Sequence, residues 1–448
     1  MAQSFFSEPA AAAAEASLPA RLFQQVRSGA WLDRRRVRAY GAILLVLEIA
    51  TLLFFIAGTH GLIVPPEEPT TTDFVSFYAA GDLANAGTPE LAYDQAAHWA
   101  AEEHATEPGI RYQFFYYPPV YLLLCALLAL LPYLPAFIIF EGATLALFLA
   151  VTRRILNERE WSSVVPLLAF PAVFWTLGLG QNAFLTAALF GAATWLIERR
   201  PFAAGLLFGA LCYKPHFGIL VPVALLAGAH WRAIGGAALA SLGLVAASIV
   251  FFGLDTWRDF LMTAINSPGT YENGRIQLAG IISPFAALRA IGISAALAYL
   301  LQLGTTFAAA LFVGYLWRRR VSLPVRAAAL IAATLVAVPV ILLYDLMLAL
   351  LAMTWLVHAA QRTGFLPWEK VTFVVLFLAA LVTLSIGRNL HVPLALIADV
   401  ILLAIIAMRA LDEIARPGGR PDRLTRPTEL GRQAPVSCRG RKRAIGSF

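Results

Sequence analysis

The segment RRRVRAYGAILLVLEIATLLFFIAGTHGLI occupies residues 34–63 and joins four arginines to a long apolar run. Within residues 41–63 the one acidic or basic side chain is Glu48, apart from a single histidine. A helix that crosses a membrane needs about 20 mostly apolar residues, and arginines gather at its cytoplasmic end. The segment therefore predicts a first membrane helix that is not cleaved as a signal peptide and that starts on the cytoplasmic side.

The rest of the chain has the same apolar character. Of its 448 residues, 59% are hydrophobic and 14% are charged, and the mean hydropathy is +0.71. A soluble globular chain is roughly 45–50% apolar and about 25% charged. The composition excludes an ordinary soluble enzyme, a disordered protein and a nucleic-acid-binding domain. We predict an all-α polytopic membrane protein with about twelve transmembrane helices. The candidate spans lie near residues 41–63, 136–153, 162–179, 183–197, 202–216, 217–230, 233–253, 293–316, 325–343, 345–360, 371–386 and 393–410.

The orientation of the later spans depends on whether the proline-bounded apolar run 118–131 crosses the membrane. The segment 64–116 before it carries nine acidic residues and one arginine or lysine, Arg111. All later arginine clusters face the cytoplasm together only if 118–131 stays on the outer surface, so we expect a juxtamembrane or re-entrant helix there. The alternative is that 118–131 spans the membrane and some arginine clusters face outward.

These features predict three regions along the chain. Residues 1–40 form a cytoplasmic tail, residues 41–410 form the membrane domain, and residues 411–448 form a basic, disordered cytoplasmic tail. Within the membrane domain we expect a first outer loop with juxtamembrane helices over residues 64–135 and a second over residues 254–280.

The first outer loop is too long and too patterned for a simple connector. Thr70-Thr71-Thr72-Asp73 is a helix-start signal, and the apolar spacing that follows predicts two amphipathic helices on the outer leaflet, separated at Gly87-Thr88-Pro89. Asp73 would lie at the mouth of the helical bundle. It is either a functional carboxylate or a helix N-cap, and the local sequence does not separate these alternatives.

Further polar residues stand at the predicted outer ends of spans, where a charge at membrane depth is costly and marks a binding site by default. Lys214 precedes a proline, so it either binds a phosphate or extends to the membrane surface. His216 fits a helix-end hydrogen bond better than a metal site, because no cluster in the chain has metal-ligand spacing. The full set is Gln181, Asn182, Lys214, His216, Tyr344, Asp345, Arg388, Asn389 and His391.

Three carboxyl side chains, Glu48, Glu141 and Asp399, fall inside apolar spans. Each could relay protons in a transporter, but they are scattered, so we expect them to have structural partners. The sequence shows no nucleotide-binding glycine loop, zinc-protease motif or nucleophile elbow. Its two halves show no evident repeat, which weakens a transporter interpretation.

Several short motifs follow one another along the chain. They are Asp73-Phe74, Tyr78-Ala79-Ala80, Gly87, Tyr93-Asp94, Tyr117-Pro118-Pro119, Leu131-Pro132, Gly180-Gln181-Asn182, Lys214-Pro215 and Tyr344-Asp345-Leu346. As an ordered set over roughly residues 40–360 they resemble glycosyltransferase family 87, the polyprenyl-phosphate-mannose-dependent mannosyltransferases of the GT-C fold. His216 departs from this resemblance, because a Gln-like residue is expected after the Lys-Pro pair, and the departure concerns the contacts around the donor phosphate.

The resemblance implies an inverting transfer of a hexose, mannose in the first place, from a polyprenyl-phosphate donor on the outer face. Asp73 matches the catalytic base, which must come within about 2.6–3.2 Å of the acceptor hydroxyl to take its proton. The departing phosphate needs cations, and Lys214 is the first candidate and Arg275 the second. No metal ion or other cofactor is expected.

The aromatic side chains near the outer surface have two possible roles. They could stack on sugar rings or line a lipid groove, or they could belong to the interfacial aromatic belt. The residues concerned are Trp99, Tyr116, Tyr117 and Tyr271. Asp345, beside Tyr344, either binds sugar hydroxyls or caps the helix that it opens.

The expected partners are the lipid-linked donor, a glycolipid or glycan acceptor and membrane lipid, and nucleic acid is not among them. The expected location is a bacterial inner membrane, with the catalytic face toward the periplasm. Two other classes stay open from the sequence. One is a transporter or flippase of lipid-linked glycans that uses the membrane carboxyls, and the other is a scaffold subunit whose outer loop binds a partner.

Overall fold

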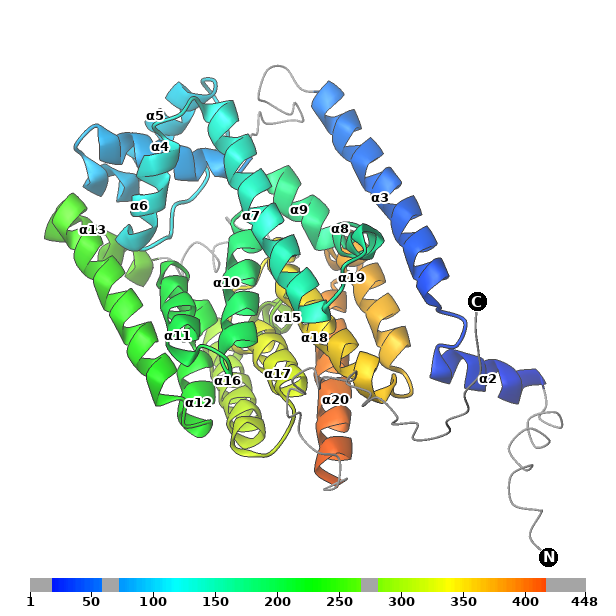
Figure 1. Cartoon of the computed structure of the whole chain (residues 1–448). Coiled ribbons are helices and arrows are strands. Elements are labelled where there is room, and N and C mark those ends of the chain that lie inside the picture. Colours follow the sequence, from blue (N-terminus) through cyan, green and yellow to red (C-terminus); the bar gives the residue numbers. More distant parts are fainter. Residues whose placement is uncertain (1–17, 59–71, 267–280, 416–448) are drawn as a thin grey trace, which may run out of the picture.

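The computed structural model describes residues 18–58, 72–266 and 281–415 (Figure 1). These residues are almost entirely helical, and the β-structure among them is one isolated bridge between Ile281 and Leu342. The prediction of an all-α polytopic membrane protein is confirmed. The longer helices are α3 (Arg34–Ala57), α7 (Tyr133–Leu156), α13 (Trp231–Asn266), α16 (Ala295–Arg318), α18 (Met347–Thr363), α19 (Glu369–Leu390) and α20 (Leu394–Ala415).

Seven helices in the described part of the chain are long and apolar enough to cross a membrane, or eight if the bent pair around residues 162–179 counts as one span. Four more of the twelve predicted spans correspond to shorter apolar helices. The number of crossings therefore stays a prediction. The shorter helices of the bundle are α8 (Val165–Leu168), α9 (Pro171–Leu179), α10 (Ala183–Leu196), α11 (Pro201–Ala210), α12 (Val221–Ala227), α15 (Pro284–Ala290) and α17 (Leu323–Ala337).

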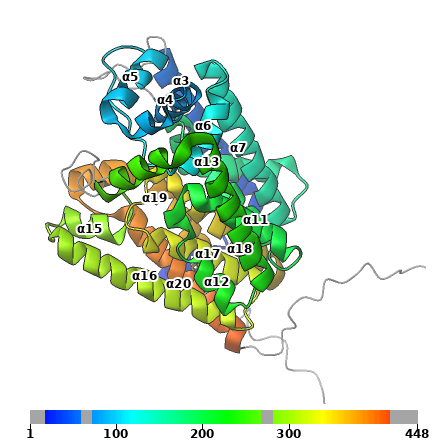
Figure 2. The same ribbon diagram turned by 90° about the vertical axis from the view of Figure 1, so that its left-hand side faces the viewer.

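The centre of the bundle is the helix pair α17 and α18, which is enclosed by the other helices (Figures 1 and 2). Every residue of α17 from Ala327 to Ala337 is buried, and 89% of the apolar window of the span Leu343–Thr363 is buried. By contrast, 11% of the corresponding window of α3 is buried. A helix that faces membrane lipid has an apolar surface that no other helix covers. We therefore interpret α3 as a membrane span at the periphery of the bundle.

The first outer loop forms a compact layer at one end of the bundle, where Figure 1 groups its helices beside the end of α13. Its apolar helix α6 has ten residues and is about 15 Å long, half of the ~30 Å hydrocarbon core. It packs against α4 and α13, which fits the expected juxtamembrane helix. The elements of this layer are α4 (Phe74–Asn85), η1 (Pro89–Tyr93), α5 (Gln95–Ala105) and α6 (Pro119–Leu128).

Part of the expected second outer loop is helical. Helix α13 bends at Gly253, whose φ of 82° and ψ of 170° lie outside the helical region, and then continues to Asn266. Beyond the bend Phe260 contacts Tyr93 of η1, with ring centroids 5.7 Å apart. The outer end of α13 therefore covers the first loop. Residues 267–280, including Arg275 and Tyr271, lie outside the described residues.

Helix α2 (Leu18–Ser28) precedes α3 and is held against the turn that opens α19. The amide of Trp368 donates to the Arg27 carbonyl at 2.7 Å, and Lys370 donates to the carbonyls of Gly29 and Leu32 at 3.3 and 2.9 Å. Within the predicted cytoplasmic tail, the described segment before α3, residues 18–33, is thus attached to the bundle.

A buried ion pair joins α19 and α20 at the end of the bundle where α19 begins. Arg409 of α20 donates to both carboxylate oxygens of Glu369, at 2.9 and 2.6 Å, and also to the Thr363 hydroxyl and the Gly364 carbonyl. Glu369 in addition accepts from the Leu366 amide at 2.8 Å. The pair joins three helices, and its polar atoms are satisfied as a buried charge pair requires.

Removing one partner of this pair should strongly destabilise the protein. We expect Arg409→Ala to reduce stability by ~3–5 kcal/mol, because the Glu369 carboxylate is then buried without its counter-charge. The double variant Arg409→Leu with Glu369→Leu should lose less, because no lone charge remains. Thermal unfolding of the purified protein in detergent measures both. A double variant less stable than Arg409→Ala would contradict this account.

Candidate active site

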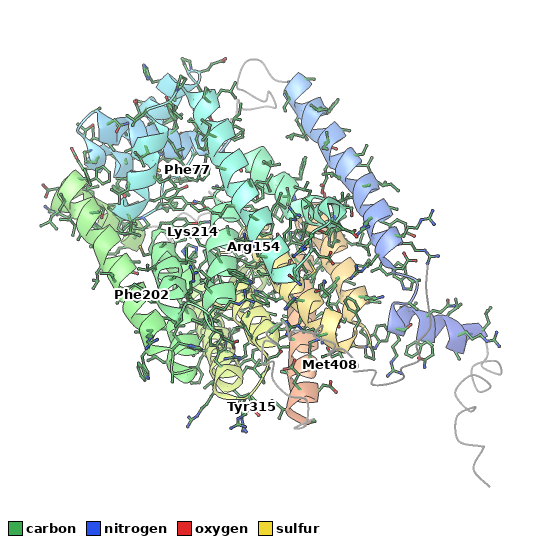
Figure 3. All side chains as sticks on the ribbon, viewed as in Figure 1. Phe77, Arg154, Phe202, Lys214, Tyr315 and Met408 are labelled. Atoms are coloured by element: carbon green, nitrogen blue, oxygen red, sulfur yellow. The ribbon has the colours of Figure 1, made fainter. Side chains whose placement is uncertain are left out.

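Helix α4 carries Asp73 into the junction between the outer layer and the bundle. We expected an amphipathic helix on the membrane surface, but α4 is buried on nearly every side from Phe74 to Gly81. Gly81 lies so close to α6 that a Cβ atom there would overlap the carbonyl of Cys125. In Figure 3 the labelled Phe77 lies in this outer layer and Lys214 lies next to it, at the top of the bundle.

Asp73 stands immediately before α4 but does not cap it. Its side chain accepts no hydrogen bond from the amides of the first turn. Instead, the Gln181 amide Nε2 donates to Asp73 Oδ2 at 2.8 Å, across 108 residues of sequence. The N-cap alternative for Asp73 is therefore wrong, and the carboxylate belongs to the interface between loop and bundle.

Gly180 sets the position of Gln181. Its φ of 69° is left-handed and ends α9, and a Cβ atom there would come within 2.8 Å of Phe74 Cβ. Glycine is the residue that takes this conformation without strain. The turn thus brings the Gln181 amide against the start of α4.

The electrostatic surroundings of Asp73 suit a proton acceptor near neutral pH. Burial raises the pKa of Asp73 to about 6, although the hydrogen bond from Gln181 opposes the rise. The residue as a whole is half-buried. A carboxylate with this pKa is mostly ionised at neutral pH and is more basic than an ordinary aspartate.

Tyr117 connects Asp73 to the deeper part of the site. Its hydroxyl donates to Gln181 Oε1 at 3.4 Å, a long hydrogen bond, and its carbonyl accepts from the Tyr93 hydroxyl at 2.9 Å. The ring lies edge-on to Phe77 at 5.3 Å. The Lys214 ammonium lies over the Tyr117 ring, 5.9 Å from its centroid.

Lys214 and Asp345 form a buried ion pair. Nζ of Lys214 lies 3.2 Å from Asp345 Oδ1, and the two residues are 4% and 5% exposed. The Asp345 Oδ2 atom accepts from the Leu342 amide at 3.1 Å, so Asp345, the third residue of the turn η6 (Leu343–Leu346), caps the start of that turn and also pairs with Lys214. The alternative in which Lys214 extends to the membrane surface is wrong.

An aromatic box encloses the rest of the Lys214 ammonium. Besides Tyr117, the rings of Phe217 and Tyr344 have their centroids 5.3 and 5.2 Å from Nζ. Ring faces attract a cation most strongly when water is excluded. The sequence placed Lys214, Tyr344 and Asp345 among the candidates, but gave no sign that Phe217 joins them.

Asn182 and Tyr121 add polar atoms next to this box. Both side chains are buried, and the Asn182 amide interacts with the Tyr117 and Tyr121 hydroxyls, although these contacts do not reach good hydrogen-bond geometry. A buried polar group without a partner costs about 1–3 kcal/mol. Asn182 and Tyr121 therefore keep hydrogen-bonding capacity that the described residues do not fully use.

The remaining candidates lie apart from this chain of contacts. His216 is exposed and contacts Phe217, with ring centroids 4.6 Å apart, and Trp99 donates to the Ile110 carbonyl at 2.8 Å. Tyr116 stacks on Phe114 at 5.4 Å. Arg388, Asn389 and His391 are exposed at the end of α19. Among the described residues no group of three His, Cys, Asp or Glu side chains could hold a metal ion.

The carboxyls inside the spans lack the partners that we expected. Both oxygens of Glu141 and of Asp399 and one oxygen of Glu48 are buried without a hydrogen-bond partner in the described part of the chain. For these oxygens, the prediction that the three carboxyls have structural hydrogen-bond partners is wrong among the described residues. Their spacing in the sequence gives no information on which helices would face them.

The sequence analysis did not single out a fully buried pair, His98 and Glu102, that packs behind α4. His98 Nε2 lies 3.1 Å from the carbonyl of Ser76 in α4, and Glu102 Oε2 accepts from the Gln113 amide at 3.0 Å. His98 Nδ1 faces Glu102 Oε1 at 3.5 Å. The four-residue spacing on α5 was the one signal available in the sequence.

Burial keeps this pair neutral. It raises the pKa of Glu102 to about 9 and lowers the pKa of His98 to about 4. At neutral pH the protonated carboxyl of Glu102 then faces His98 Nδ1, and Nε2–H donates to Ser76. The pair links α5 to α4 three residues after Asp73 and to the strand-like segment that leads to Tyr117.

Comparison with known proteins gives one match. The model of glycosyltransferase family 87 matches residues 115–343, just over half of the chain. The chain belongs to glycosyltransferase family 87. No curated protein and no solved structure matched significantly.

This membership makes the chain a membrane glycosyltransferase and confirms the family resemblance seen in the sequence. The matched region of this family 87 chain contains Tyr117, Gln181 and Lys214, but it begins after Asp73 and ends before Asp345. The connection of Asp73 to the matched region is therefore supplied by the contacts described above and not by the comparison.

The neutral state of the His98–Glu102 pair can be tested with two substitutions. Glu102→Gln should leave the unfolding temperature nearly unchanged at pH 7, because an amide can replace a protonated carboxyl toward both His98 and Gln113. Glu102→Ala should lose about 1–3 kcal/mol, because it leaves buried groups without partners. Thermal unfolding in detergent distinguishes the two. An equal loss in both variants would mean that the pair is ionised.

Proposed function

We propose that this glycosyltransferase transfers a hexose, mannose in the first place, from a polyprenyl-phosphate donor to a glycolipid or glycan acceptor, with inversion at the anomeric carbon. We further propose that the reaction takes place at the outer face of a bacterial inner membrane. The observation that supports the proposal is the Gln181–Asp73 hydrogen bond, which joins a carboxylate of the first outer loop to a polar and aromatic cluster of the bundle.

Asp73 is the proposed general base. A single carboxylate is sufficient when the leaving group is a phosphate, because the departing oxygen needs no strong acid. The acceptor hydroxyl would lose its proton to Asp73 while its oxygen forms the bond to C1, and the C1–O bond to the phosphate breaks on the opposite side. A carboxylate with a pKa of about 6 has enough basicity to assist this step and remains ionised at neutral pH.

Lys214 is the proposed electrostatic partner of the donor phosphate. Its ammonium has three protons, one of which is directed to Asp345, and the described residues offer the other two no hydrogen-bond acceptor. The rings of Tyr117, Phe217 and Tyr344 lie nearby and exclude water. A fixed positive charge in a site that excludes water stabilises developing negative charge better than a solvated one. Asp345 holds Lys214 in place, and the Asn182 amide and the Tyr121 hydroxyl are the proposed contacts of the sugar hydroxyls.

Arg275 and His216 have secondary roles in the proposed donor site. Arg275 remains the second candidate for the phosphate, although it lies outside the described residues. His216 is exposed next to Phe217 and follows Pro215. We propose that it contacts the donor at the position where a Gln-like residue is expected.

Transport of a lipid-linked glycan is the second candidate function, and one observation favours it. Glu141 and Asp399 are buried carboxyls without partners among the described residues, as proton-coupling residues would be. Family membership supports transfer instead. Proton-dependent glycan flux in proteoliposomes, without sugar transfer, would decide for transport.

Asp73 should control both the rate and its pH dependence. Asp73→Asn should lower kcat by about 10²–10⁴-fold, because the amide cannot take the proton. In the unaltered protein kcat/KM should fall as the pH decreases through about 6, since the base must be ionised. Gln181→Met removes the hydrogen bond that lowers the pKa of Asp73, so the decline should begin at a higher pH.

These measurements need purified protein in lipid nanodiscs with a labelled polyprenyl-phosphate mannose and an acceptor extract. Asp82→Asn, a change at a partly exposed position on the same helix, is the matched control and should leave the rate and the pH profile unchanged. Near-normal turnover of Asp73→Asn would remove Asp73 from the mechanism.

Variants of the Lys214–Asp345 pair can distinguish a role of Lys214 in donor binding from a role in folding. Lys214→Met should destabilise the protein, because Asp345 is left charged and buried. Adding Asp345→Asn should restore stability but not donor affinity, which depends on the positive charge. Unfolding temperature and the equilibrium binding of the polyprenyl-phosphate donor are the two readouts. If the double variant binds the donor normally, the role of Lys214 is structural alone.

A further inference from the structure

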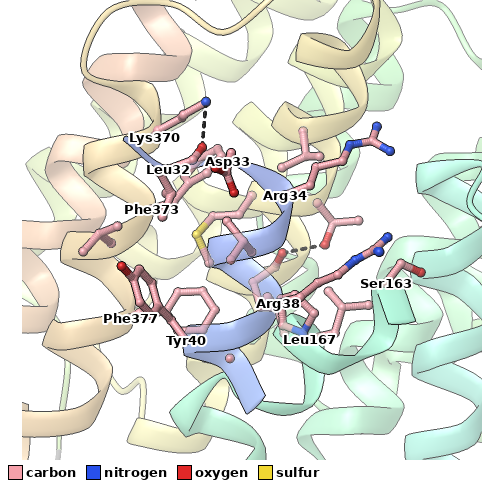
Figure 4. A pocket seen from close by; sticks show the side chains of 18 of the residues that line it. Leu32, Asp33, Arg34, Arg38, Tyr40, Ser163, Leu167, Lys370, Phe373 and Phe377 are labelled. Atoms are coloured by element: carbon pink, nitrogen blue, oxygen red, sulfur yellow. Dashed lines mark hydrogen bonds between the residues drawn. The ribbon is translucent and has the colours of Figure 1, made fainter. Parts of the chain in front are cut away.

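A large cavity lies between α3 and the bundle, far from Asp73 (Figure 4). Its volume is about 560 Å³, within the range of ~300–1,000 Å³ typical of sites for small organic ligands. One wall is α3, the opposite wall is formed by α18 and α19, and α8 closes a third side. No part of the proposed transfer reaction uses it.

The walls of this cavity are apolar. On α3 the lining residues Val37, Gly41 and Leu44 follow one another at helical spacing, so one face of α3 points inward. From α19, Phe373 and Phe377 line the cavity, and Figure 4 shows both beside α3. Such walls suit a hydrocarbon chain.

The cavity is open on one side. Two of its lining residues, Tyr40 and Leu378, are 52% and 55% exposed. Helix α3 is a membrane span that contacts the bundle mainly through α8 and α9, so the open side faces the lipid. A chain from the surrounding bilayer can enter without crossing a polar surface.

Positive charge surrounds the end of the cavity where α3 begins. Arg34, Arg38 and Lys370 line it, against two acidic lining residues, Asp33 and Glu158. Asp33 is engaged as the N-cap of α3, accepting from the Arg36 amide at 2.8 Å, and Glu158 lies 3.7 Å from Arg34. Arg38 pairs with Glu160 at the surface, 2.6 Å away. The first turn of α3 adds Arg35, Arg36 and the positive end of the helix dipole.

We propose that this cavity binds one anionic phospholipid of the leaflet in which α3 begins. An acyl chain fills the space between Val37, Leu44 and Phe373, and the phosphate lies at Arg34 and Arg38. Lys370 adds positive charge to this end of the cavity while it donates to the carbonyls of Gly29 and Leu32. Guanidinium groups match phosphate oxygens in pairs, and basic pockets between membrane helices select anionic headgroups. The polyprenyl-phosphate donor does not fit this role, because the candidate catalytic residues are grouped with α4 at the opposite end of α3 (Figure 1).

The test uses delipidated full-length protein in detergent and two probes with identical acyl chains, dioleoyl phosphatidylglycerol and dioleoyl phosphatidylcholine. Native mass spectrometry counts bound lipid, and thermal unfolding with added lipid gives the relative affinity. We expect one tightly held phosphatidylglycerol per chain and a larger rise in unfolding temperature with phosphatidylglycerol than with phosphatidylcholine.

Two pairs of variants separate the headgroup from the chain. Arg34→Ala with Arg38→Ala should weaken phosphatidylglycerol binding roughly 30-fold, at about one kcal/mol for each basic residue. The matched control, Arg318→Ala with Arg320→Ala, removes the same charge from exposed positions at the end of α16 and should have little effect. Val37→Trp fills the cavity and should abolish tight binding, whereas Val46→Trp, on the exposed face of α3, should not.

Equal binding of the two lipids, or equal behaviour of Val37→Trp and Val46→Trp, would overturn the proposal. Displacement of phosphatidylglycerol by an equimolar polyprenyl phosphate would also overturn it, and would make the cavity a site for the isoprenoid carrier. A dimer that forms in place of lipid binding, and that Val37→Trp disrupts, would show that a second copy of the chain occupies the groove. Loss of transfer activity in Asp73→Asn has no bearing on these outcomes.

Discussion

The hydrogen bond from Gln181 to Asp73 joins the first outer loop to the helical bundle, and the candidate site depends on it. Without this contact, Asp73 would be an acidic residue in a loop and Lys214 a lysine inside a membrane protein. With it, Asp73, Gln181, Tyr117 and Lys214 form a continuous series of contacts from the surface to a buried ion pair. The left-handed turn at Gly180 and the close approach at Gly81 are the backbone conditions for that arrangement.

The sequence was sufficient to predict the fold class, and it singled out most residues that the structure brings together in the candidate site, for a physical reason. In an apolar chain a polar side chain is costly, so Lys214, Asp345 and the Gln181-Asn182 pair are conspicuous against their surroundings. Apolar spans can likewise be recognised from their length and composition, and positive charge predicts their orientation.

Other features could not be predicted, because they arise from contacts between distant segments. Lys214 and Asp345 are 131 residues apart, and nothing local distinguishes a lysine that extends to the surface from one that is paired. Helix α4 looked amphipathic, yet it is buried on nearly every side from Phe74 to Gly81, because α5, α6 and η1 pack around it. The His98–Glu102 pair had the spacing of an ordinary surface ion pair, and burial made it neutral.

The attachment of α2 beside α19 affects the cavity at the start of α3. Trp368 and Lys370 bind carbonyls of residues 27–32, and the same turn is fixed from its other side by Arg409 through Glu369 and Gly364. The segment before the first span thus forms part of the wall of the cavity, through Trp31 and Leu32. A chain shortened to begin at the first membrane helix would retain every candidate catalytic residue and yet lose that wall, so an amino-terminal truncation is not a neutral choice for expressing this protein.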